Sequence, residues 1–198
     1  MRSASVHDLT SLARIRATAL RLFAEKGVAA TSLRAVARDA HVSPALGVHH
    51  FGSKEGLAEA VDDAVVARFL ERVRSVPLDG PDVLRRRGEL LGDLIAGEPI
   101  LCDYMARALA EGTQTSADLF HRLFAAARAD DALVAAGTVR ADTDPDWRAL
   151  QQLILVVGPL LLRPLVEREL GASLYSPESV ERWMAATLDL LQRGIYER

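Results

Sequence analysis

A chain of 198 residues can bury a substantial hydrophobic core, either as one domain or as a small domain followed by a larger one. Helix-forming residues dominate, only 5% of residues are aromatic, and the single cysteine excludes both a disulfide framework and a metal site built from cysteine pairs. The net charge of −3 conceals an asymmetry, because residues 1–57 carry 8 Lys/Arg against 4 Asp/Glu, whereas the remainder carries 16 against 23.

This asymmetry suggests that a small basic module for a polyanion precedes a larger body with another task. The N-terminus has no apolar signal-peptide core, and the longest apolar run, residues 153–162, is far shorter than the ~20 residues that a membrane-spanning helix needs. We therefore expect a soluble, cytoplasmic, all-α protein with no membrane partner. Residues 1–57 are expected to form its first domain and residues 58–198 its second.

Periodicity and capping residues predict the first two helices. Apolar residues recur at three- and four-residue steps before Lys26, which predicts an amphipathic helix that ends there, at Gly27. Ser32 is placed to cap a short second helix that ends at about His41.

A tight turn separates the second helix from the third. Ser43 can cap the third helix and Pro44 fits its first turn, where a missing N–H group costs nothing, so the helix runs to about His50. Ser53 is placed to cap a longer fourth helix. Two short helices joined by a turn form a helix-turn-helix arrangement, which here coincides with the basic segment.

The third helix should present small and polar groups to solvent. Its apolar residues are expected to hold it against the other helices: Val42, Leu46 and Phe51. Its outward face is expected to consist of Ala45, Gly47, Val48 and His49.

The composition changes after Pro77, and residues 77–82 are predicted to form a loop. Helices of the larger body are expected at residues 81–97, 99–111 and 116–129, from Pro145 past Leu165, and from Pro177 onward.

Prolines and glycines add local detail to the larger body. Pro159 and Pro164 should bend or break the apolar helix that contains them, because each removes a backbone donor. Asp144 is placed to cap that helix. Gly88 and Gly92 have the spacing of a close contact between two helices.

The N-terminal residues also resemble a known family. The matching positions span about residues 9–60 and are Leu22-Phe23, Gly27, Thr31-Ser32, Val36-Ala37, Val42-Ser43, His50-Phe51 and Ser53-Lys54-Glu55. They resemble the signature of TetR-family transcriptional regulators, whereas residues 80–198 resemble the family only in size, helical content and a long final helix pair. The resemblance implies a homodimer whose C-terminal domain binds a small molecule and thereby releases double-stranded DNA.

The same resemblance implies a set of DNA-binding residues: Ser32, Arg34, Ser43, Pro44, Ala45, Leu46, Gly47, Val48, His49, His50 and Lys54. Ser32 and Lys54 are placed by it at the duplex backbone. The family often has a glycine, a threonine and a leucine-tyrosine pair where this chain has Ala45, Leu46, Gly47 and Val48. The missing tyrosine hydroxyl removes a usual phosphate contact, which His49 or His50 could replace, and Gly47 would let the helix backbone approach the duplex.

The two adjacent histidines allow other interpretations. A metal site needs further ligands three or four residues away or a downstream cluster, and the sequence offers none, so we expect no metal or other cofactor. An enzyme is not expected either, because no nucleophile motif or oriented triad is recognisable. For His50, packing against Phe51 remains an alternative to phosphate contact.

Two further sets of residues are expected in the larger domain. Effector-binding residues are expected among its apolar and aromatic side chains, with one glutamine: Tyr104, Met105, Phe120, Phe124, Trp147, Gln151 and Leu155. The apolar stripe of the last helix is too wide for one neighbour, so a dimer interface is expected at Leu161, Trp183, Leu188 and Leu191.

These observations predict a ligand-responsive DNA-binding regulator. We expect a repressor that binds a palindromic operator as a homodimer and that an unidentified small-molecule effector releases. The alternative is a helical protein-interaction adaptor that uses the helix-turn-helix as a scaffold without specific DNA readout.

Overall fold

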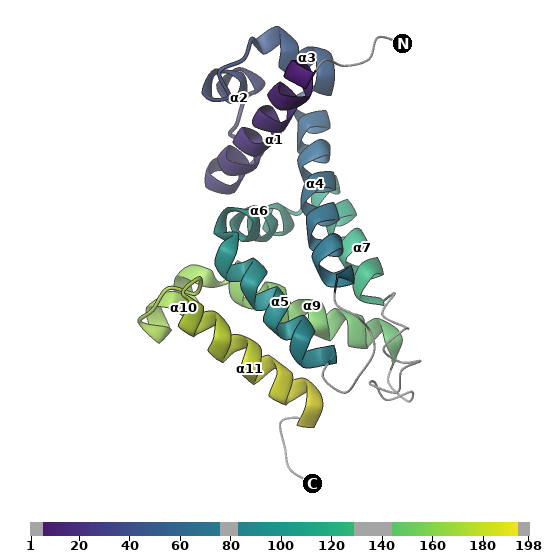
Figure 1. Ribbon diagram of the computed structural model, residues 1–198, viewed down its shortest axis with the longest axis vertical. Helices are drawn as coiled ribbons and strands as arrows, with labels where there is room; N and C mark the ends of the chain where they lie inside the picture. Colours follow the sequence, from purple (N-terminus) through teal and green to yellow (C-terminus); the bar gives the residue numbers. More distant parts are fainter. Residues whose placement is uncertain (1–5, 76–82, 129–143, 194–198) are drawn as a thin grey trace. The chain divides into compact units, whose positions relative to one another are not determined.

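The computed structural model describes residues 6–75, 83–128 and 144–193, so the predicted loop at residues 77–82 lies outside the described residues. Within the three described segments the chain forms α-helices and no strand, which confirms the predicted all-α fold (Figure 1). The helices are α1 (Val6–Lys26), α2 (Leu33–Asp39), α3 (Pro44–Phe51), α4 (Lys54–Arg74), α5 (Val83–Gly97), α6 (Pro99–Ala110), α7 (Gln114–Arg128), α9 (Pro145–Leu161), α10 (Arg163–Leu170) and α11 (Pro177–Arg193).

The described residues divide into two packing units. The first unit contains the chain as far as Ala67 together with Ile100–Leu119, and the second contains Arg68–Pro99 and the residues from Phe120 onward. Most of α6 therefore packs within the first unit, although α6 follows α5 of the second unit in the sequence. The domain boundary expected after Leu57 stays a prediction, because a unit of packed residues need not be a separately folding domain.

The N-terminal helices begin and end where the capping residues predict. α1 ends at Lys26, and Gly27 has a φ of 82°, a conformation that glycine adopts at little cost. The hydroxyl oxygens of Ser32, Ser43 and Ser53 each accept a hydrogen bond from a first-turn backbone N–H of the following helix, at 3.1, 3.3 and 3.1 Å. Each bond satisfies one of the N–H groups that a helix start leaves without a partner.

The core of the first unit is formed by apolar side chains of α1, α2, α4 and α6. Most of them recur at helical spacing, so that each helix presents one apolar face. They include Ile15, Ala19, Leu22, Phe23, Val36, Ala37, Leu57, Val61, Val65, Leu101 and Met105.

Polar contacts fix α6 within the first unit. The buried Tyr104 hydroxyl donates a hydrogen bond to the buried Asp62 carboxylate of α4 (2.7 Å). Burial and the nearby Asp62 charge raise the pKa of Tyr104 well above its usual range, so the phenol stays neutral. Arg107 donates from Nε to the Ala24 carbonyl (2.9 Å) and from Nη2 to the Glu25 carbonyl (3.3 Å), near the C-terminal end of α1.

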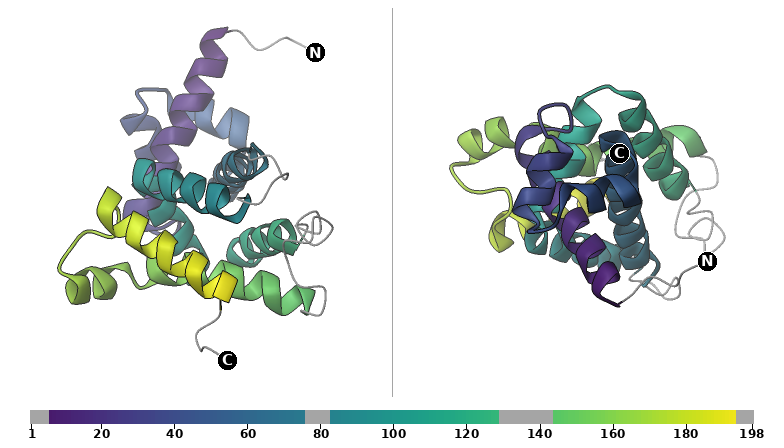
Figure 2. Two further views of the ribbon diagram at one scale, coloured as in Figure 1. Left: turned by 60° about the horizontal axis from the view of Figure 1, so that its bottom comes forward. Right: turned by 90° about the horizontal axis from the view of Figure 1, so that it is seen from above.

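In the second unit α5 and α11 lie side by side (Figure 1, Figure 2). A Cβ atom on Gly88 would lie 2.9 Å from Leu188 Cδ1, and one on Gly92 would lie 3.2 Å from Val180 and 3.3 Å from Met184. The two glycines therefore allow α11 to approach α5 closely, which confirms the prediction from their spacing.

The apolar stretch near the C-terminus forms two helices instead of one. α9 begins after Asp144, whose side chain accepts hydrogen bonds from two first-turn N–H groups (2.9 Å each), as expected for a cap. It ends at Leu161, and α10 departs at 74° with Pro164 in its first turn. Pro164 has no N–H to donate to the Leu160 carbonyl, as a continuous helix would require, which accounts for the break, whereas Pro159 lies inside α9 without ending it. Among the described helices no single one is long and apolar enough to cross a membrane, and the α9–α10 pair meets that test only when the two are taken together across this bend.

Candidate nucleic-acid interface

Helices α2 and α3 form the predicted helix-turn-helix. The turn between them contains His41, whose φ of 54° lies in the left-handed region that histidine adopts more readily than most side chains. The Val42 N–H donates to the Ala37 carbonyl (3.0 Å), which ties the turn back to α2. The turn thus sets the direction in which α3 leaves α2.

The exposed face of α3 carries the residues expected to reach DNA. Ala45, Val48, His49 and His50 are exposed, with Val48 at 51%. The imidazole rings of His49 and His50 meet edge to face, with centroids 5.0 Å apart. Two imidazoles beside an apolar side chain at the surface can offer donors to phosphate or to base edges.

Gly47 differs from the other residues of this face. Gly47 was expected on the exposed face of α3, but its backbone is buried, so this expectation is wrong. A Cβ atom at this position would nevertheless meet no heavy atom within 4 Å, so the space where a side chain would stand is open.

The opposite side of α3 is held by neighbouring helices. Val42, Leu46 and Phe51 are partly buried, which agrees with their predicted role as anchors. A Cβ atom on Gly56 of α4 would lie 2.2 Å from the Phe51 carbonyl oxygen. Only glycine fits there without movement of the backbone, so Gly56 fixes how closely α4 follows α3.

Ser32, Arg34 and Lys54, placed by the resemblance at DNA, occupy different positions in the structure. Ser32 and Arg34 are exposed at the start of α2, where Ser32 also caps the helix. Lys54 is partly buried, and its Nζ donates a hydrogen bond to the Ala29 carbonyl (3.1 Å) in the segment between α1 and α2. Lys54 therefore has a structural contact, and its role at phosphate stays a prediction.

Ion pairs at the end of α2 connect it to α1. Arg21 of α1 contacts Asp39 at 3.3 Å, and Arg38 contacts the same carboxylate at 3.3 Å. Desolvation alone would raise the pKa of Asp39, but the hydrogen bonds from Arg38 and Arg21 outweigh it and hold the pKa below its ordinary value. This stabilisation is present above the ordinary aspartate pKa and is lost as the pH falls through the lowered value.

The residues expected to bind an effector are divided between the two units. Tyr104 and Met105 are buried in the first unit. In the second unit the Phe120 and Phe124 rings stack with centroids 6.3 Å apart, whereas Trp147 is 63% exposed. The other two, Gln151 and Leu155, lie on α9 and are exposed and half-buried. Their assignment to an effector stays a prediction.

The residues expected at a dimer interface differ in what they contact. Leu161 and Leu191 are exposed, at 43% and 42%. Leu188 is half-buried against Gly88 of α5, and the Trp183 indole N–H donates to the Leu155 carbonyl of α9 (3.2 Å). Leu188 and Trp183 therefore have contacts inside their own chain that the apolar stripe did not reveal.

No metal centre is built by the described residues, because they contain no group of three or more His, Cys, Asp or Glu side chains that could hold an ion.

Comparisons with known proteins agree with this geometry. The family model for bacterial regulatory proteins of the tetR family matches residues 15–61, and the model for the tetracyclin repressor-like C-terminal domain matches residues 98–197. The chain is 36% identical over 163 residues to the HTH-type transcriptional regulatory protein RaaS of Mycobacterium tuberculosis, which covers 82% of this chain and 74% of that protein.

Solved structures share the fold. GusR of Salmonella enterica has a TM-score of 0.73 at 25% identity, covering 94% of this chain and 95% of that one. The fatty acid degradation regulator FadR from Bacillus halodurans has a TM-score of 0.76 at 16% identity, covering 93% and 99%. Because the two family models match the N-terminal and C-terminal parts and a close relative spans most of the chain, this protein belongs to the TetR family, whose members are DNA-binding transcriptional regulators and not enzymes.

Proposed function

We propose that this regulator is a repressor that binds a palindromic operator as a homodimer and is released by a small-molecule effector. The observation that carries the proposal is the exposed face of α3, where Ala45, Val48, His49 and His50 are open to solvent while the opposite side of α3 packs against neighbouring helices of the first unit. A rigid helix with small and polar outward groups fits the major groove, where base edges can be read.

Exposed apolar side chains support the homodimer. Large hydrophobic residues of the second unit stand exposed on or next to its last three described helices: Ile154, Leu161, Leu162, Leu165, Leu170 and Leu191. Such a surface is costly in water and is typical of a contact between subunits. Two α3 helices in a dimer would need a separation of about 34–36 Å to enter successive major grooves.

We propose that an effector releases the DNA by changing the distance between the two α3 helices of the dimer. A ligand that binds better to a dimer with a different separation of the two α3 helices would lower DNA affinity without touching DNA. The match of residues 98–197 to the tetracyclin repressor-like C-terminal domain supports a ligand site in that part of the chain.

Selection from random DNA duplexes by gel shift tests the proposal. We expect a palindromic winner whose half-sites are about one helical turn apart, with a footprint that requires two subunits. Binding that is sensitive to salt but indifferent to sequence would instead favour the protein-interaction adaptor. Val48→Asp serves as a matched negative control, because it places a negative charge on the exposed face without removing a packed side chain.

A further inference from the structure

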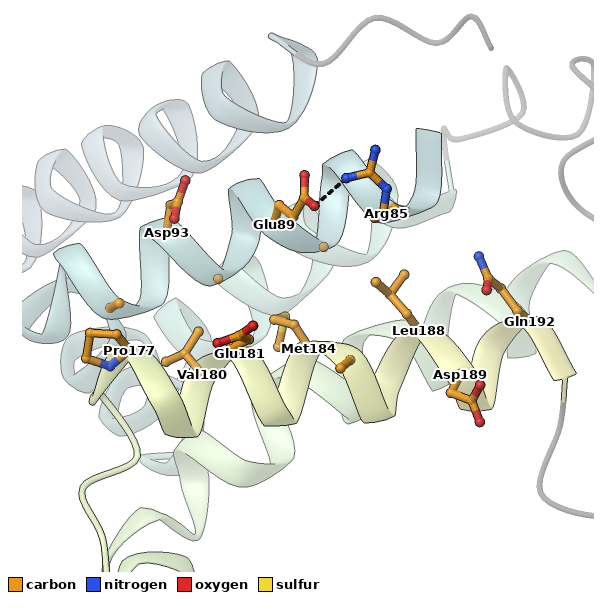
Figure 3. A pocket seen from close by; sticks show the side chains of 14 residues that line it. Arg85, Glu89, Asp93, Pro177, Val180, Glu181, Met184, Leu188, Asp189 and Gln192 are labelled. Carbon is orange, nitrogen blue, oxygen red and sulfur yellow. Dashed lines mark hydrogen bonds and ion pairs between the residues drawn. The ribbon is translucent and has the colours of Figure 1, made fainter. Parts of the chain in front are cut away.

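A groove runs between α5 and α11 in the second unit (Figure 3). Its volume is about 720 Å³, which lies in the range of sites for drug-sized molecules. Val180, Met184 and Leu188 point from α11 toward α5 and form an apolar floor with Ala96 of α5. None of the seven residues expected to bind an effector lines this groove.

The rim of the groove is acidic. Glu89 and Asp93 line it from α5, and Glu181 and Asp189 line it from α11. Arg85 is the one cation among the lining residues, and it forms an ion pair with Glu89 (2.5 Å). The groove therefore keeps a net negative charge on both walls.

Two of these carboxylates have no ion pair among the residues that the structure describes: Asp93 on one wall and Glu181 on the other. Both are exposed. A carboxylate on each wall above an apolar floor is complementary to a molecule that has a hydrophobic body and a positive charge.

We propose that the α5–α11 groove binds amphipathic organic cations. The apolar floor takes up the hydrophobic body, and the charges of Asp93 and Glu181 select against anions of the same shape. The groove is a ligand site separate from DNA binding, so its test needs no operator and does not depend on the proposed function.

Isothermal titration of the full-length protein with tetraphenylphosphonium and with tetraphenylborate tests the proposal, since the two ions have nearly the same size and shape and opposite charge. We expect the cation to bind and the anion to bind at least tenfold more weakly. Equal or tighter binding of tetraphenylborate, or no binding of the cation, would overturn the proposal.

Matched variants locate the binding. Asp93→Asn and Glu181→Gln should each weaken cation binding by about two- to fivefold, the range for a charge interaction at an exposed site. Glu178→Gln removes an exposed carboxylate from the first turn of α11, outside the groove lining, and should leave the affinity unchanged. If all three variants bind like the wild type, the cation binds elsewhere and the proposal is wrong.

A variant with a bulky side chain in the groove tests whether a small cation or a second copy of the chain occupies it. Ala185 is an exposed lining residue, so Ala185→Trp should fill the groove and abolish cation binding while circular dichroism and oligomeric state stay unchanged. A folded Ala185→Trp variant that becomes monomeric would show that a second subunit occupies the groove, and one that retains wild-type affinity would show that the cation lies outside it. Either result would overturn the proposal.

Discussion

The indole N–H of Trp183 donates a hydrogen bond to the Leu155 carbonyl oxygen, 3.2 Å away on α9. In an unbroken α-helix this carbonyl would accept from the N–H of the residue four positions later, and here that residue is Pro159, which has none. Trp183 thus satisfies a carbonyl that the proline leaves without its helical donor, and the bond fastens α11 to α9.

Loss of this hydrogen bond should lower the stability of the protein, and a second substitution should restore part of it. We expect Trp183→Phe to lower the free energy of unfolding by roughly 1–3 kcal/mol, because a partly buried carbonyl loses its donor. Adding Pro159→Ala supplies the missing backbone N–H, so the double variant should regain part of the loss in denaturant unfolding. If the effects of Trp183→Phe and Pro159→Ala simply add, the proline and the tryptophan are not coupled through this carbonyl.

A charge at Leu191 should separate the subunits. Leu191 is 42% exposed, so Leu191→Glu changes a surface and not the core, and we expect a monomer in sedimentation together with weaker operator binding. Leu188 is a poorer choice, because its side chain also packs against Gly88. Gln192→Glu adds the same charge at the next exposed position and should stay dimeric. A Leu191→Glu variant that sediments as a dimer would rule this residue out of the interface.

Lys54 has two possible roles, and salt dependence distinguishes them. If its ammonium group contacts phosphate, Lys54→Ala should weaken binding to all sequences alike and reduce the salt slope by about one unit, the change for one lost phosphate contact. If it acts only by holding the Ala29 carbonyl, the variant should lose stability while the slope stays the same. Lys54→Arg keeps the charge and should keep the slope. We expect the first result, with discrimination between operators retained.

Operator affinity tests the role of His49. If its exposed imidazole donates a hydrogen bond to phosphate or to a base edge, His49→Ala should weaken operator binding by roughly 1 kcal/mol, the scale of one hydrogen bond at a wet site. Gel-shift titrations of the two proteins at constant ionic strength measure the difference. Equal operator affinity of His49→Ala and the wild type would show that His49 does not contact the duplex.

Gly47→Ala should raise the stability of the free protein and lower its affinity for the operator. Alanine has room there, since a Cβ atom meets nothing within 4 Å, and Gly47→Ala should stabilise the free protein by roughly 0.5–1 kcal/mol through helix propensity. Operator affinity should fall if the backbone of α3 approaches the duplex at this point. Gly97→Ala is the control, because it also has open space but lies at the end of α5. Unchanged operator affinity would place Gly47 away from the duplex.

Local patterns predict the helices well and the contacts between distant helices poorly. Ser32, Ser43 and Asp144 cap the helices that they were expected to cap, because a cap depends only on residues a few positions away. The interactions of Tyr104 with Asp62 and of Arg107 with Ala24 join residues 42 and 83 positions apart, and nothing in the local sequence marks them.

The candidate sites follow the same rule. The outward face of α3 could be predicted because one helix and its turn define it. The groove between α5 and α11 could not be predicted in this way, because it forms only when two helices that are far apart in the sequence pack together. Its one sequence signal was the spacing of Gly88 and Gly92, which predicts the close approach but not the acidic rim.

The attachment of α6 to α1 and α4 limits where this regulator can be spliced to a relative. A chimera joined within α4, after Asp62, would bring in a foreign α6, leaving the Asp62 carboxylate without the Tyr104 hydroxyl and the carbonyls of Ala24 and Glu25 without Arg107. Such a chimera would be less stable, because the buried Asp62 carboxylate would lack a hydrogen-bond donor. Transplanting Ile100–Leu119 together with the N-terminal helices keeps these bonds, so the unit of exchange in this protein is discontinuous in sequence.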